Sequence, residues 1–161
     1  MMKIFIKQVF IFLVTFPIFS IAEEFDLVCE GIEEIRVNSL GVSEDVEKTV
    51  ILKIRKDRLI MVKDSHFNKP DVFMNEEFTI PTTETGDEIK GTNTFEVTEE
   101  KILGYLRAVV SPDPFELIDS VYVNRYNGKF KIEDYHRDIK TLEIIMSNNI
   151  NGVCKKGKQA F

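Results

Sequence analysis

Apolar and polar residues alternate in several short segments of the chain, which is the pattern of half-buried β-strands. In the segment 25–29 the odd positions would share one face, and the segment 50–54 alternates in the same way. Lys56 and Asp57 predict a turn into another strand at 58–62. We expect further strands at 72–80, 87–97, 102–110 and 141–147, followed by a last one that carries Cys154.

Asn127-Gly128 predicts a β-hairpin, because Asn-Gly is the preferred pair for a two-residue type I′ turn in which both residues need positive φ. Such a turn would place Val123 opposite Ile132 and Arg125 opposite Phe130. The expected register puts Val121, Val123, Phe130 and Ile132 on one face, with Asn124 opposite Lys131 and Tyr122 opposite Glu133 on a largely polar reverse face. A slip by one residue would destroy this sorting.

Two segments are ambiguous. Apolar residues in the segment 102–109 have helical spacing, but Gly104 and a β-branched end favour a strand there. The segment 134–140 could form a short helix. Roughly eight short strands separated by turns predict a mainly β fold. We expect a small antiparallel meander barrel with at most one short helix, and a β-sandwich is the alternative.

The first 22 residues have the three-part layout of a secretory signal peptide. Lys3 and Lys7 precede an apolar run at 9–19, and small residues stand before the expected cleavage between Ala22 and Glu23. The alternative is an uncleaved anchor, but the apolar run is shorter than the roughly 20 residues that a membrane span needs. The sequence therefore predicts a signal peptide at 1–22 and one β-rich domain at 23–161, in the periplasm or outside the cell, with no stable membrane span after cleavage.

The mature domain would be strongly acidic. Removing Lys3 and Lys7 with the leader changes the net charge from −6 to −8. This charge disfavours binding to nucleic acid or to an anionic membrane. It suits solubility or a basic protein partner, and the sequence does not identify that partner.

The chain has only two cysteines, Cys29 and Cys154, near the two ends of the mature domain. An even number of cysteines in an exported protein predicts one disulfide. The bridge requires the first and last strands to lie side by side, because the Cα atoms of a disulfide are within about 7 Å of each other. In a closed barrel these two strands are neighbours.

No residue pattern predicts a catalytic, cofactor or metal site. His66 lies in Asp64-Ser65-His66, but the members of a catalytic triad are set by spatial geometry and not by adjacency in the chain. His136 has no second ligand at metal-binding spacing. Carboxylate doublets such as Glu76-Glu77 would point to opposite faces of a strand, so we interpret them as solvated.

Three short segments resemble a group of short exported proteins of Gram-negative bacteria. The opening Leu27-Val28-Cys29-Glu30-Gly31 is similar to their L-x-C-x-G start, and Val123 to Phe130 resembles their [IV]-N-R-x-x-G-x-F hairpin. The ending Gly152-Val153-Cys154, with a terminal Phe161, is similar to their G-x-C…F end. The resemblance implies the strand boundaries and a periplasmic address, and it carries no activity with it.

A more distant similarity is to the periplasmic inhibitors of c-type lysozyme, which are also small, acidic, disulfide-linked β-barrels. Their Ser-Gly-rich inhibitory loop has no counterpart in this chain. From these observations we expect a non-enzymatic binding or interaction protein. The alternatives are an inhibitor of a cationic hydrolase such as lysozyme and a lipocalin-like carrier of a small ligand, whose barrel would be hollow instead of packed.

Overall fold

The computed structural model describes residues 24–37, 42–63, 70–81, 88–111 and 115–157, and for residues 42–44 it describes only the backbone. These residues form one antiparallel sheet of ten strands in the order β4-β3-β2-β1-β10-β9-β8-β7-β6-β5. The strands are β1 (Phe25–Val37), β2 (Val42–Ile54), β3 (Arg58–Lys63), β4 (Asp71–Met74), β5 (Glu76–Pro81), β6 (Glu88–Val97), β7 (Lys101–Ser111), β8 (Phe115–Asn124), β9 (Lys129–Asp138) and β10 (Ile144–Lys156).

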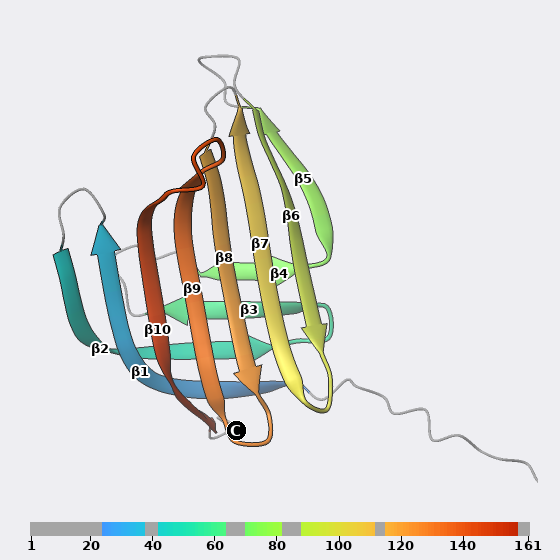
Figure 1. Cartoon of the computed structure of the whole chain (residues 1–161). Helices are drawn as coiled ribbons and strands as arrows, with labels where there is room; N and C mark the ends of the chain where they lie inside the picture. The colour runs from blue at the N-terminus through green and yellow to red at the C-terminus, as the bar shows by residue number, and fades with distance from the viewer. Residues whose placement is uncertain (1–23, 38–41, 64–69, 82–87, 112–114, 158–161) are drawn as a thin grey trace, which may run out of the picture.

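The sheet coils until it is nearly closed into a barrel. Strands that are consecutive in the chain pair with one another, except that β1 pairs with β10 and that β4 and β5 stand at opposite ends of the strand order. In Figure 1, β6 to β10 run upright, and β3, β4 and parts of β1 and β2 run across them. A curled sheet of this kind turns one face of its strands toward a shared interior, although no residue of β5 is buried.

Side-chain amides bridge the seam between β4 and β6. The Asn93 amide donates to the Val72 carbonyl at 2.9 Å, and its oxygen accepts from the Met74 amide at 3.2 Å. The Asn75 oxygen accepts from the Phe95 amide at 2.8 Å. At this point β4 and β6 are not joined by strand pairing, and the asparagine side chains bind their backbone groups instead. These hydrogen bonds hold the barrel nearly closed.

The predicted mainly β, antiparallel barrel is confirmed, with ten strands in place of about eight. The segment expected at 72–80 is divided at Asn75 into β4 and β5, and the segments expected at 141–147 and around Cys154 are one strand, β10. The residues between 102 and 109 lie in strand β7. The short helix expected at 134–140 was wrong: β9 continues to Asp138 because its partners β8 and β10 bind this segment as a strand.

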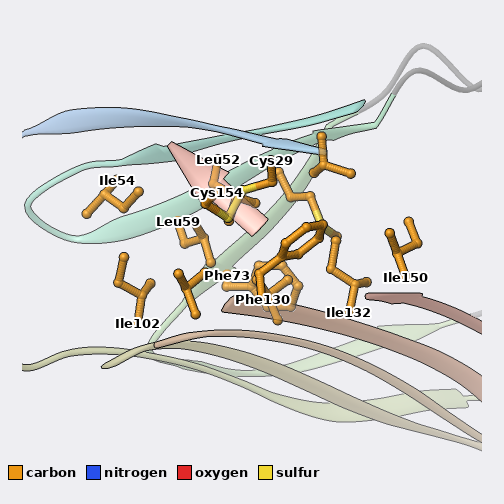
Figure 2. Packing of buried hydrophobic residues seen from close by; sticks show 14 residues of the cluster. Cys29, Leu52, Ile54, Leu59, Phe73, Ile102, Phe130, Ile132, Ile150 and Cys154 are labelled. Carbon is orange, nitrogen blue, oxygen red and sulfur yellow. A yellow bond between two sulfur atoms is a disulfide. The ribbon is translucent and has the colours of Figure 1, made fainter. Parts of the chain in front are cut away.

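The core lies between the crossing parts of the sheet. Val50 and Leu52 are fully buried and Ile54 nearly so, as the alternation in β2 predicts. Phe73 comes from β4 and meets side chains of the upright strands in the middle of the barrel, as Figure 2 shows. The centre of the barrel is therefore packed with side chains.

The β8–β9 hairpin exists, but the predicted turn type was wrong. Val123 pairs with Phe130, and not with Ile132, so the register differs by two residues from the one expected. A longer turn replaces the two-residue turn, and of its residues only Gly128 has a positive φ, of 71°. A shift of two residues keeps every side chain on its face, and Val121, Val123, Phe130 and Ile132 are all buried.

Candidate functional site

The predicted disulfide joins β1 to β10. Cys29 and Cys154 face each other in the register of the two strands, with Cα atoms 3.9 Å apart. Two residues further along, Gly31 faces Gly152 in the same register. The Cys-x-Gly segment of β1 and the Gly-x-Cys segment of β10 therefore pair directly, with the disulfide at one position and two facing glycines two residues away.

Phe130 explains why glycines stand at this point. A Cβ added to Gly31 would come within 3.0 Å of the Phe130 ring, and one added to Gly152 within 2.7 Å. The backbones are equally close, because a Cβ on Gly152 would lie 2.0 Å from the Glu30 carbonyl oxygen. The segments 27–31, 123–130 and 152–154 thus meet around the disulfide.

A pocket of about 350 Å³ opens next to the disulfide, at the end of the barrel where β1 starts and β8 ends. We call it the mouth pocket. Its apolar lining includes Phe25, Leu27, Ile102 and Val123. Cys154 and the turn residues Asn127 and Gly128 complete one side, and Arg125 and Lys156 are its two cationic residues. The mouth pocket is therefore apolar with positive charge beside it.

Arg125 is held in place from several sides. Its backbone amide donates to the Glu100 carbonyl at 2.9 Å, and its guanidinium donates to the Thr98 carbonyl. The same guanidinium lies over the Phe25 ring, 5.8 Å from the ring centre, where the negative face of the ring attracts a cation. No carboxylate in the described part of the chain lies within 4 Å of Arg125 or Lys156, so neither charge is neutralised by an ion pair there.

The turn that borders the mouth pocket is organised by asparagine side chains. The Asn124 side-chain oxygen accepts from the Tyr126 and Asn127 amides at 3.0 and 3.2 Å. The Gly128 amide donates to the Asn124 carbonyl, and the Gly128 carbonyl accepts from the Cys154 amide, both at 2.8 Å. The turn is thereby fastened to the last strand, so the wall of the pocket is formed before any ligand arrives.

A second polar group lies on the inner face of the barrel, away from the mouth pocket. Asp119 on β8 pairs with Asp134 on β9, and the charges of Lys63 and Asp71 act on both carboxyl groups. Lys63 Nζ lies 3.4 Å from Asp71 Oδ2. Burial raises the pKa of Asp119 to about 7, with the negative charges of Asp71 and Asp134 adding to the effect and Lys63 opposing it. Burial also raises the pKa of Asp134.

Among the described residues no group of three or more His, Cys, Asp and Glu side chains could hold a metal ion. His136 lies on β9 near Asp134, and His66 lies outside the described residues. Within the part of the chain described here, no helix is long and apolar enough to cross a membrane.

The structure brings Cys154, Asn127 and Gly128 together at one site, although the sequence singled them out for separate reasons. Ala22 and Glu23 lie outside the described residues. The sequence interpretation missed Arg125 and Phe25 as site residues. A signal was present in the sequence, because the alternation of Val121 and Val123 leads to a charged residue at 125. The structure places Arg125, exposed, just past the end of β8.

The chain was compared with protein-family models, with curated proteins and with solved structures, and none of them matches it.

Proposed function

We propose that this protein is an exported, non-enzymatic binding protein that takes a small amphipathic anion in the mouth pocket. The signal peptide would be cleaved between Ala22 and Glu23, and residues 23–161 would act in the periplasm or outside the cell. The Cys29–Cys154 disulfide is consistent with such an oxidising compartment.

One observation carries the proposal: Arg125, which forms no ion pair with the described residues, is held beside an apolar pocket. An arginine in this setting binds a carboxylate, sulfate or phosphate through charge-assisted hydrogen bonds. The apolar walls would take the hydrocarbon part of the same ligand. A volume of about 350 Å³ is in the range of small-molecule sites, near its lower limit.

The shape of the site supports a ligand held at the end of the barrel over a filled core. Ile102 and Val123 line the mouth pocket, and both belong to the buried core. A ligand would therefore rest on the core and leave its charged group near Arg125 and Lys156. This differs from a carrier in which the ligand fills the barrel interior.

The test is calorimetric titration of the mature, oxidised protein with decanoate and with neutral decanol. We expect decanoate to bind, and Arg125→Gln to weaken it by about tenfold or more, because a hydrogen bond to a charged group contributes about 1.5–3 kcal/mol. Decanol should lose no affinity in the same variant. NMR titration should move the amide signals of Val123 and Asn127.

Arg36→Gln is the matched control, since Arg36 is an exposed arginine near the end of β1, away from the mouth pocket. It should leave decanoate binding unchanged. If decanoate gives neither heat nor shifts at Val123 and Asn127, or if both arginine variants weaken it equally, the proposal is wrong.

A further inference from the structure

The outer face of the sheet has a groove of about 590 Å³ over β5, β6 and β7. We call it the outer groove. Thr79, Lys90, Thr92 and Arg107 supply polar groups to it, and Glu77 supplies a negative charge. In the strand register Thr79 pairs with Lys90 and Thr92 pairs with Arg107, so these side chains stand in adjacent rows on one face.

A buried carboxylate stands next to this groove. The side chain of Glu116 is only 1% exposed, although it points to the outer face. One of its oxygens accepts from Arg107 Nε, and the other accepts from Nε of Arg137 at 2.9 Å and from Nη2 of the same residue. The two arginines hold the pKa of Glu116 below its usual range in spite of its burial. Glu116 thus remains charged and fixes both guanidinium groups.

The hydrogen bond to Glu116 uses only the Nε group of the Arg107 guanidinium. Only Nε of Arg107 takes part in a hydrogen bond with another described residue, and the side chain is half exposed. Its two Nη groups remain as a pair of parallel donors, which is the geometry that binds a carboxylate or a phosphate with two hydrogen bonds. Lys90 adds a cation, partly balanced by Glu88 at 2.7 Å.

We propose that the outer groove binds an acidic saccharide, with the anionic group of the sugar on Arg107. The fixed Nη pair of Arg107 would hold a uronate carboxylate or a sugar phosphate. The hydroxyl groups of Thr79 and Thr92 and the carboxylate of Glu77 would bind sugar hydroxyls, which explains why an acidic side chain lines the same groove. Glu116 is a positioning residue, because it touches Arg107 and not the ligand. This site is separate from the mouth pocket and does not depend on it.

The test is NMR titration of the mature, oxidised protein with trigalacturonate, neutral maltotriose and inorganic phosphate. Trigalacturonate should shift the Arg107 Nε–H signal and the backbone amides of Lys90 and Thr92. Maltotriose should bind at least tenfold more weakly, since it lacks the charge. Phosphate alone should reach Arg107 with lower affinity than trigalacturonate, since it lacks the hydroxyl contacts.

Variants separate recognition from positioning. Arg107→Gln should reduce trigalacturonate affinity tenfold or more, whereas Arg58→Gln, at an exposed arginine on β3, should not change it. Glu116→Gln should weaken binding and broaden the Arg107 Nε–H signal, because the guanidinium is no longer fixed, and Glu116→Asp should restore part of both. Arg125→Gln should leave this binding intact, even if the mouth pocket proposal fails.

The proposal is overturned if trigalacturonate causes no shift at Arg107. It is also overturned if maltotriose binds as well as trigalacturonate, or if Arg107→Gln behaves like Arg58→Gln.

Discussion

Asp119 is a carboxyl group whose affinity for its proton is changed by the fold. One of its carboxyl oxygens is buried without a hydrogen-bond partner in the described structure, and burial raises its pKa to about 7 from 3.8. The folded protein therefore holds this proton more tightly than the unfolded chain does. The contribution of Asp119 to the free energy of unfolding is greatest below about pH 4, falls as the pH rises toward 7, and is constant above that.

Asp119→Asn should remove most of this pH dependence, because the amide is neutral at every pH. At pH 8 we expect the variant to be more stable than the wild-type protein by about 1–3 kcal/mol. The change in the pKa of Asp119 sets an upper limit of about 4 kcal/mol on this difference. At pH 4 the two proteins should have similar stability. Urea unfolding at the two pH values measures this. Glu47→Gln, at an exposed glutamate on β2, is the control for the loss of one charge. Equal pH profiles for wild type and Asp119→Asn would contradict the assignment.

At the scale of elements, the decisive pair is β1 and β10. They bring the two ends of the domain together, and the glycine pair lets Phe130 pack over both strands. Gly152→Ala should therefore be strongly destabilising, by about 3 kcal/mol, because its Cβ would meet the Glu30 carbonyl and the Gly31 Cα, which are backbone atoms and cannot turn aside. Chemical denaturation measures the loss.

Gly157→Ala is the matched control for this prediction. A Cβ there would meet nothing closer than the Asp26 carbonyl oxygen at 3.2 Å, so we expect a change within about 1 kcal/mol. Comparable losses in the two alanine variants would show that the close approach at Gly152 does not constrain the strands.

At the scale of the whole molecule, the disulfide joins two cysteines that are 125 positions apart in the sequence and so closes almost the whole domain into a ring. It restricts the unfolded chain and also contributes buried sulfur atoms to the core. The double variant Cys29→Ala, Cys154→Ala should lower the free energy of unfolding by about 2–5 kcal/mol. Reduction should lower the melting temperature of the wild-type protein to near that of the variant.

The same reductant should leave the melting temperature of the double alanine variant unchanged. If reduction does not alter the wild-type melting temperature either, then the bond does not stabilise the barrel as described.

Much of the architecture followed from local patterns. The alternation at 50–54 identified a buried face, and two cysteines at the ends of the domain predicted that the first and last strands are neighbours. The hairpin at 127–128 was located correctly, but its register was not. The reason is that Asn124 caps a longer turn with its side chain, and a two-residue turn and this one both keep Val123 and Phe130 facing inward.

The sequence by itself determined the strand periodicity, the cysteine pairing and the net charge, because each depends on residue type and spacing alone. Only the tertiary structure decided which polar residues meet. Arg125 and Phe25 are 100 residues apart, and Glu116 binds arginines from strands on either side. The barrel curvature sets these distances, and curvature results from the packing of all the strands together.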